Sequence, residues 1–224
     1  MLVKLVILLD FTKHKLCPKK NTSPFKNQTN VTLMDFMDML SAPKAMTMVL
    51  DLDETLIHHT LTPPTIGKYK TLQFKPVGAD SWITFYVQKR PFLSEFIELL
   101  QKDFKIIIYT SSLKEYADVI IDYIDAHKVL NKRYYRDSCV QSNGQFFKDL
   151  KQVDSDLNKT FILDNDPHKI LQEKNVVKIK SWEGENNHDS CLAALATIIR
   201  QKCEEMKESE NWNKRLDITS FVKD

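Results

Sequence analysis

The chain of 224 residues has 42% hydrophobic and 28% charged residues, a composition typical of a globular protein rather than a disordered one. Its formal net charge of +2 gives no electrostatic reason to expect direct binding of nucleic acid. The 4 glycines are isolated, which excludes a glycine-rich nucleotide loop, and the 4 cysteines form no Cys-x-x-Cys pair. We therefore expect free thiols and a reducing nuclear or cytoplasmic location.

Residues 1–43 are predicted to form an extension ahead of the folded domain. The run at 2–9 is apolar apart from one lysine and too short to cross a membrane, so it reads as a weak signal segment, a strand or a docked extension. The stretch 13–26 is basic and contains no acid, which leaves a mitochondrial address open. A short amphipathic helix or turn is expected at 32–40.

The apolar, β-prone run at 46–50 predicts a short buried strand that ends in an acidic loop. Asp51 and Asp53 follow it directly. Two neighbouring carboxylates at the edge of a core repel each other and lose hydration, which is costly unless a cation binds there or one carboxyl stays protonated. An ordinary acidic surface turn is the alternative. Because ligands of open α/β sheets bind at the carboxyl ends of strands, the position favours a site.

The segment after the acidic loop is predicted to form a β-hairpin flap over that site. Its strands are expected at 69–75 and 82–88, where aromatic and β-branched residues gather. A helix then begins with Pro91 in its first turn, and its apolar face is formed by Phe92, Phe96, Leu99 and Leu100.

Strands and helices alternate through the rest of the chain. Buried strands are predicted at 104–109 and 160–163, short strands at 133–147, and an edge strand at 175–179. Asn143 and Gly144 are expected to form a hairpin turn, and Asp166 to cap a helix that begins at Pro167. The two remaining helices carry apolar stripes of Leu113, Tyr116, Ala117, Ile120, Ile121 and Ile124, and of Leu192, Leu195, Ile199, Cys203 and Met206. This alternation implies an α/β fold with a doubly wound parallel sheet, a flap and a small β insert.

Six stretches resemble, in order, the motifs of the haloacid dehalogenase superfamily. They read LDLDETLIH, QKRPFLSEF, YTSSLKEYAD, YRDSC, FFKDL and ILDND, followed by KSW. The chain is most similar to the protein-phosphatase branch, the RNA polymerase II carboxy-terminal domain small phosphatases and their Dullard-like relatives, which share the FCP homology domain. The resemblance places a phosphatase domain at 44–206 and leaves 207–224 as a tail.

The resemblance implies a Mg²⁺-dependent protein serine/threonine phosphatase that works through an aspartyl-phosphate. Asp51 would be the nucleophile and Asp53 the general acid and base. Mg²⁺ would be held by the Asp51 carboxylate, the Asp53 main-chain carbonyl and the Asn165 side chain. Thr110 and Lys148 would bind the phosphate, and Arg136 and Tyr116 would contact the substrate peptide. Thr55 and Asp164 would orient these groups without touching the substrate.

The expected partner is a phosphoprotein with an extended phosphoserine or phosphothreonine segment, such as the RNA polymerase II carboxy-terminal domain. Substrate selectivity is expected from the flap residues Trp82, Ile83 and Phe85, with Leu113 and Tyr116 opposite them. Packing within the hairpin explains Trp82 and Phe85 equally well. We expect a monomer without a membrane span. A small-molecule phosphatase of the same superfamily and a binding module like a mitochondrial presequence-translocase subunit remain as alternatives.

Four residues near the motifs are expected to have other roles. Arg90 should brace the acidic loop. Cys139 should lie beside the site without acting as a nucleophile. His58 and His59 should be strand residues leading into the flap, because no third nitrogen or sulfur ligand is spaced for zinc.

Overall fold

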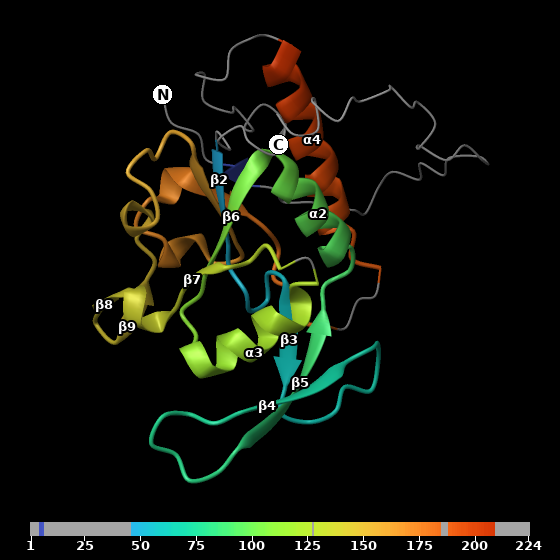
Figure 1. Cartoon of the computed structure of the whole chain (residues 1–224), viewed down its shortest axis with the longest axis vertical. Coiled ribbons are helices and arrows are strands. Elements are labelled where there is room, and N and C mark those ends of the chain that lie inside the picture. Colours follow the sequence, from blue (N-terminus) through green and yellow to red (C-terminus); the bar gives the residue numbers. More distant parts are fainter. Residues whose placement is uncertain (1–4, 7–45, 127, 185–187, 209–224) are drawn as a thin grey trace, which may run out of the picture.

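The computed structural model describes residues 5–6, 46–126, 128–184 and 188–208 (Figure 1). The predicted helix at 32–40 lies outside these residues, and the division into 1–43, 44–206 and 207–224 stays a prediction. The elements follow in the order β1 (Leu5–Val6), β2 (Met46–Leu50), β3 (Ile57–Thr60), β4 (Lys70–Phe74), β5 (Ile83–Lys89), α2 (Leu93–Asp103), β6 (Phe104–Tyr109), α3 (Lys114–Ile124), β7 (Lys132–Tyr134), η1 (Arg136–Ser138), β8 (Val140–Ser142), β9 (Gln145–Phe147), η2 (Leu150–Gln152), β10 (Thr160–Asp164), η3 (Pro167–Lys169), η4 (Glu173–Asn175), β11 (Val176–Lys178) and α4 (Cys191–Glu208).

A six-stranded parallel sheet forms the centre of the molecule, in the order β1-β11-β10-β2-β6-β7. Successive side chains of a strand point to opposite faces, so Met48 and Leu50 enter one core while Val49 enters the other. The first core also holds apolar residues of α2, α3 and α4, and the second holds Leu150 of η2. This is the predicted doubly wound α/β fold.

Strand β11 differs from the prediction in its place in the sheet. We expected an edge strand at 175–179, but β11 lies between β10 and β1, because Leu5–Val6 pairs along its outer side. Of the three alternatives predicted for residues 2–9, the strand is the one found, at Leu5–Val6.

Helix α2 begins two residues later than Pro91. Phe92 is the N-cap residue of α2 and adopts a left-handed conformation with φ 64°, so it precedes the helix. It is 47% exposed. The prediction that Phe92 belongs to the buried face was wrong; Leu93 takes that place, with Phe96, Ile97 and Leu100. Helix α3 buries the predicted stripe apart from Leu113, which precedes the helix and is 38% exposed.

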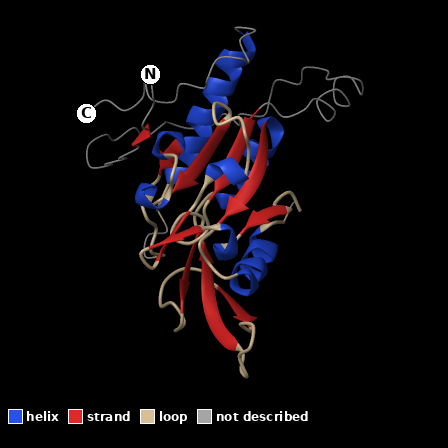
Figure 2. Cartoon of the chain, turned by 90° about the vertical axis from the view of Figure 1, so that its left-hand side faces the viewer, coloured by secondary structure: helices blue, strands red, loops and turns tan. Residues whose placement is uncertain are grey.

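The flap is a three-stranded antiparallel sheet, β3-β5-β4, that extends from the body of the molecule (Figures 1 and 2). His58 and His59 lie in β3, as predicted, and add a third strand to the expected hairpin. Phe85 is 1% exposed and packs edge-on against Phe74 and beside Tyr116. Of the two alternatives left open for Phe85, packing is therefore the one that the structure has, and contact with a substrate is excluded because α3 covers this side of the flap. Trp82 is 64% exposed.

The small β insert is the hairpin β8-β9. Its turn residues Asn143 and Gly144 have φ values of 50° and 74°, which is the left-handed pair that a tight hairpin turn requires. Asp166 caps the short helix η3, as predicted, by accepting a hydrogen bond from the main-chain N–H of His168. Among the described residues, no helix is both long and apolar enough to span a membrane.

Candidate active site

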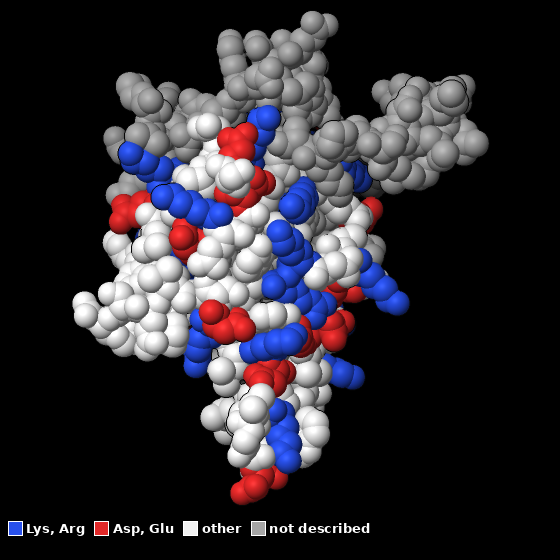
Figure 3. Space-filling view, turned by 60° about the vertical axis from the view of Figure 1, so that its left-hand side comes forward, with Lys and Arg blue, Asp and Glu red and all other residues white. Residues whose placement is uncertain are grey.

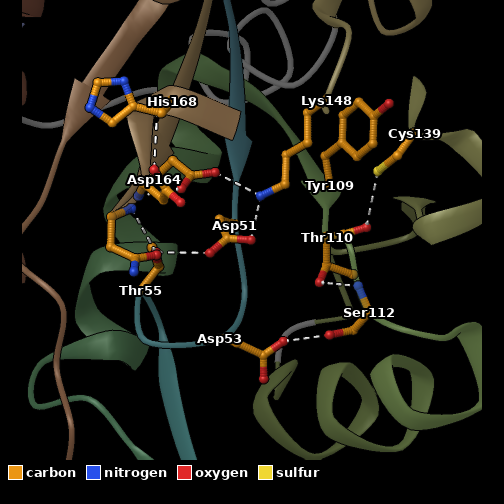
Figure 4. Close-up of polar contacts among 12 residues, drawn as sticks. Asp51, Asp53, Thr55, Tyr109, Thr110, Ser112, Cys139, Lys148, Asp164 and His168 are labelled. Atoms are coloured by element: carbon orange, nitrogen blue, oxygen red, sulfur yellow. Dashed lines mark hydrogen bonds and ion pairs between the residues drawn. The ribbon is translucent and has the colours of Figure 1, made fainter. Parts of the chain in front are cut away.

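Polar residues from three neighbouring strands meet at one edge of the central sheet (Figure 4). Asp51 follows β2, Thr110 follows β6, and Asp164 ends β10. These strands are parallel and adjacent in the order β10-β2-β6, so their carboxyl ends lie side by side. The topology explains why residues more than 100 positions apart share one site.

Lys148 joins two of these strand ends. Its Nζ lies 2.5 Å from Asp51 Oδ1 and 2.6 Å from Asp164 Oδ2, and its side chain is almost fully buried. The main chain of Lys148 bridges to the segment after η3, because its N–H donates to Lys169 and its carbonyl accepts from Leu171. A long, flexible side chain is thereby delivered to the sheet edge from the β insert.

Burial controls the charges in this cluster. Burial raises the pKa of Asp51 to about 7, and the nearby charge of Asp164 adds to the rise, although the Lys148 ammonium opposes it. Burial disfavours the ammonium as well, but the charges of the two carboxylates outweigh this and raise the pKa of Lys148. The site thus holds a permanent buried cation between two carboxyl groups.

Asp53 points away from Lys148, toward the start of α3. Its carboxylate accepts hydrogen bonds from the Tyr116 hydroxyl at 2.5 Å and from Ser112 Oγ at 2.7 Å, and His59 Nδ1 lies 3.4 Å away. Burial alone would raise the pKa of Asp53, but the hydrogen bonds of His59, Tyr116 and Ser112 outweigh it and lower the pKa. Asp51 and Asp53 therefore lie in environments that shift their pKa values in opposite directions.

Thr55 connects Asp51 with Asn165. Its hydroxyl oxygen is 3.0 Å from both Asp51 Oδ2 and Asn165 Oδ1, and it accepts the main-chain N–H of Asn165 at 3.2 Å. The Asn165 Nδ2 donates to Ser181 Oγ, and its amide oxygen lies on the Thr55 hydroxyl. The Thr55 hydroxyl thus lies between a carboxylate oxygen and an amide oxygen.

The loop that carries Thr55 is held by Arg90, as predicted. The fully buried guanidinium donates from Nη1 to the Thr55 main-chain carbonyl at 3.0 Å. Its Nε and Nη2 each donate to one oxygen of Asp189 at 3.0 Å. This forked pairing orients Arg90 and so anchors the acidic loop.

The donor set fits Mg²⁺, which prefers oxygen ligands. The Asp51 carboxylate and the Asn165 amide oxygen flank the Thr55 hydroxyl, and the Asp53 main-chain carbonyl lies in the same loop. The part of the chain that the structure describes contains no group of three or more His, Cys, Asp or Glu side chains arranged to hold a metal. A metal at this edge would therefore depend on amide and main-chain oxygens.

The other predicted site residues lie around this centre. Thr110 is buried, and its Oγ1 accepts a hydrogen bond from the main-chain N–H of Ser112 at 3.1 Å. Arg136 is exposed, with its Nε bound to the Ser111 carbonyl and its guanidinium 5.1 Å from the centre of the Phe146 ring. Tyr116 is buried, and its hydroxyl donates a hydrogen bond to Asp53. It therefore contacts the acidic loop, whereas the resemblance implied contact with the substrate peptide.

Four contributors were not predicted as site residues. Ser112 and His59 contact Asp53, Ser181 orients the Asn165 amide, and Asp189 holds Arg90. Ser112 could have been found from its spacing of two residues after Thr110. Cys139 is half-buried beside Thr110, and burial raises the pKa of its thiol, which agrees with its exclusion as a nucleophile.

The strand order and the polar residues at the ends of β2, β6 and β10 define an α/β protein of the haloacid dehalogenase type. Residues 46–211 match the family described as NLI interacting factor-like phosphatase. The match covers most of the chain, and the chain belongs to this family.

Individual relatives agree with this assignment. The chain is 38% identical to a probable C-terminal domain small phosphatase of Dictyostelium discoideum over 154 residues, which is 68% of this chain but 49% of that protein. It is 34% identical to a CTD nuclear envelope phosphatase 1 homolog of Drosophila pseudoobscura pseudoobscura, over 71% of this chain and 68% of that protein. The solved fission yeast RNA polymerase II CTD phosphatase Fcp1, bound to beryllium fluoride, shares the fold with a TM-score of 0.54 at 19% identity, over 80% of this chain and 56% of that one.

Proposed function

We propose that this chain is a Mg²⁺-dependent protein serine/threonine phosphatase that forms an aspartyl-phosphate, an acyl phosphate, on Asp51. The observation that carries the proposal is the buried contact of Asp51 with Lys148 at the end of β2, with Asp53 two residues further on. A phosphoryl group is strongly negative, so an attacking carboxylate needs a neighbouring cation. Lys148 supplies one such charge.

In the first step, an oxygen of Asp51 attacks phosphorus, and the bond from phosphorus to the serine or threonine oxygen breaks. Bound Mg²⁺ would supply charge neutralisation for the phosphoryl oxygens, held by Asp51, Asn165 and the main-chain carbonyl of Asp53. Lys148 and the Thr110 hydroxyl would bind the same oxygens and hold phosphorus in line with Asp51.

Asp53 would transfer the proton in both steps. Its pKa is held low in the free protein, but the negative phosphoryl group raises it by like-charge repulsion. Protonated Asp53 then gives its proton to the leaving oxygen, and afterwards it removes a proton from the water that hydrolyses the acyl phosphate on Asp51. Tyr116 and Ser112 fix the direction of the carboxyl during both transfers.

The proposed substrate is a phosphoserine or phosphothreonine on an extended polypeptide. The flap is a three-stranded sheet, and Trp82, just before β5, and Ile83, its first residue, are exposed. These two side chains are the proposed contacts for a peptide residue near the phosphate. Acidic and basic side chains are both present on the face drawn in Figure 3. The formal net charge of +2 gives no electrostatic reason to propose nucleic acid as a substrate. The names of the relatives make the RNA polymerase II carboxy-terminal domain one candidate, and we expect a nuclear or cytoplasmic monomer.

The test is phosphate release from matched phosphoserine, phosphothreonine and phosphotyrosine peptides and from a sugar phosphate. We expect hydrolysis of the first two peptides, and transient labelling of the protein by ³²P from a labelled peptide. The Asp51→Asn variant should lose both signals, whereas Asp80→Asn, at the exposed tip of the flap, should retain them. Preference for the sugar phosphate would favour a small-molecule phosphatase, and peptide binding without turnover would favour a binding module.

A further inference from the structure

His59 lies on the face of the flap that α3 covers. In the pairing of β3 with β5 it is opposite Val87, so its side chain shares a face with the buried Val87 and Phe85. The centre of its ring is 6.4 Å from that of Phe85 and 5.2 Å from that of Tyr116, edge-on in both cases. An apolar side chain would also fit among these neighbours. The histidine instead places a ring nitrogen beside the Tyr116 hydroxyl.

The Tyr116 hydroxyl lies between two polar groups. Its oxygen is 2.5 Å from Asp53 Oδ1 and 2.8 Å from His59 Nδ1. A tyrosine hydroxyl has a single proton, and burial together with the charge of Asp53 raises the pKa of Tyr116, so the hydroxyl keeps that proton. An ionised Asp53 can only accept a hydrogen bond, so the hydroxyl donates to it. His59 must then donate from Nδ1 to the tyrosine oxygen.

The donor on His59 fixes the direction of the Tyr116 hydroxyl. With Nδ1–H directed at its oxygen, the hydroxyl meets no acceptor at His59 and donates to Asp53. The same direction holds for a neutral ring with its proton on Nδ1 and for a charged ring, because Nδ1 is a donor in both. Oδ1 of Asp53 is therefore held by two donors in series.

The other oxygen of Asp53 is held by a hydroxyl that can turn. Oδ2 accepts from Ser112 Oγ at 2.7 Å, and a serine hydroxyl can rotate and accept as well as donate. Figure 4 shows this oxygen on the side of Asp51, whereas the second oxygen of Asp53 points away from it. A proton on Oδ1 would require the Tyr116 hydroxyl to reverse, which His59 opposes. A proton on Oδ2 requires only a rotation of Ser112.

We propose that His59 is a positioning residue for the general acid. Through the Tyr116 hydroxyl it fixes Oδ1 of Asp53, so that Oδ2 carries the transferred proton. In that transfer the O–H bond at Oδ2 breaks as a new O–H bond forms on the leaving serine or threonine oxygen. The inference rests on the proposed function and adds to it a residue of the flap that acts without touching the phosphoryl group.

The test compares variants of His59 that keep or remove the donor. His59→Leu removes it, whereas His59→Asn keeps it, because the amide nitrogen of asparagine, like histidine Nδ1, is bonded to Cγ. We expect His59→Leu to lower kcat/KM for a phosphoserine peptide about threefold to tenfold, the effect of one hydrogen bond. An aryl phosphate should be nearly unaffected, because its good leaving group has less need of an acid. His59→Asn should restore most of the activity on the peptide.

The matched control is Thr60→Val. It keeps the shape of the next side chain in β3, on the opposite face of the strand, and removes one hydrogen bond, from Thr60 Oγ1 to the Thr62 carbonyl. Its kcat/KM should equal that of wild type on both substrates. A loss on the peptide alone in Thr60→Val, as large as that in His59→Leu, would show that any change in β3 has this effect and would overturn the inference.

A double variant separates action through Tyr116 from direct action on Asp53. Tyr116→Phe keeps the ring and removes the hydroxyl, so it should lower kcat/KM for the peptide at least as much as His59→Leu. In Tyr116→Phe, adding His59→Leu should cause no further loss, because the connection is already broken. A full further loss would mean that His59 acts directly across the 3.4 Å to Asp53, and the proposed connection would be wrong.

The remaining outcomes distinguish this inference from the proposed function. Equal losses on peptide and aryl phosphate in His59→Leu, or no recovery in His59→Asn, would assign His59 to flap packing and overturn its positioning role. Wild-type kcat/KM for the peptide in His59→Leu, with Asp53→Asn inactive on it, would overturn this inference alone. Failure of the wild-type protein to hydrolyse any phosphopeptide would overturn the proposed function and this inference together.

Discussion

Replacing Arg90 by methionine should destabilise the fold strongly, although Arg90 is not proposed to touch substrate. The guanidinium is fully buried and makes hydrogen bonds to both oxygens of Asp189 and to the Thr55 carbonyl, each at 3.0 Å. Methionine fills similar space but leaves the Asp189 carboxylate, with a side chain 10% exposed, without its partner. Breaking a buried ion pair in this way costs about 3–5 kcal/mol.

The assay is urea unfolding followed by circular dichroism, with a thermal scan beside it. A cost of about 3–5 kcal/mol in a domain of this size lowers the melting temperature by roughly 6–20 °C. Arg90→Lys keeps the positive charge but not the paired N–H donors of the guanidinium, so its free energy of unfolding should lie between those of wild type and Arg90→Met. The double variant Arg90→Met/Asp189→Asn should lose less than the two single changes together, because no lone charge remains buried.

The pH dependence of the same pair has a definite sign. Burial alone would raise the pKa of Asp189, but the hydrogen bonds and charge of Arg90 outweigh it and hold the pKa below its ordinary value. The contribution of the pair is therefore complete above the unfolded pKa of about 3.9 and is lost as the pH falls through the lower folded pKa. A loss under 1 kcal/mol in Arg90→Met at pH 7 would refute the reasoning and show that water screens the pair.

Three further predictions concern the proposed chemistry. Asp53→Asn should abolish hydrolysis of a phosphoserine peptide but retain part of the activity on an aryl phosphate, because that good leaving group has less need of an acid. Asp51→Asn should lose activity on both substrates, and wild-type rates in this variant would show that Asp51 is not the nucleophile. Activity should require Mg²⁺, vanish on chelation and resist replacement by zinc, and full activity after chelation and dialysis would contradict the oxygen-ligand site. Trp82→Ala should lower kcat/KM on phosphopeptides about tenfold to a hundredfold, because burying one such side chain is worth about 1.5–3 kcal/mol, while sparing an aryl phosphate. Equal losses on the two substrates would assign Trp82 to flap packing instead.

Local patterns in the sequence were enough for the strand ends. An apolar run followed by a polar residue marks a buried strand and the point where it leaves the core, so the positions of Asp51, Thr110 and Asp164 could be predicted from their neighbours alone. The alternation with amphipathic helices then required a parallel sheet, which brings those ends together. Lys148 could be included only through the resemblance to known motifs, because one lysine after a short strand has no distinctive local pattern.

Contacts between distant segments decided the rest. For Phe85 the sequence left substrate contact and packing within the hairpin both open, and helix α3 decides for packing because its Tyr116 lies against Phe85. Asp189 holds Arg90 across 99 residues, and no periodicity or spacing indicates such a pair. The hydrogen bonds of Tyr116 and Ser112 lower the pKa of Asp53, while burial raises that of Asp51 in the same loop. Sequence therefore determined which residues meet at the sheet edge, whereas the tertiary structure decided what surrounds each carboxyl, because desolvation and hydrogen bonding depend on neighbours that only folding brings near.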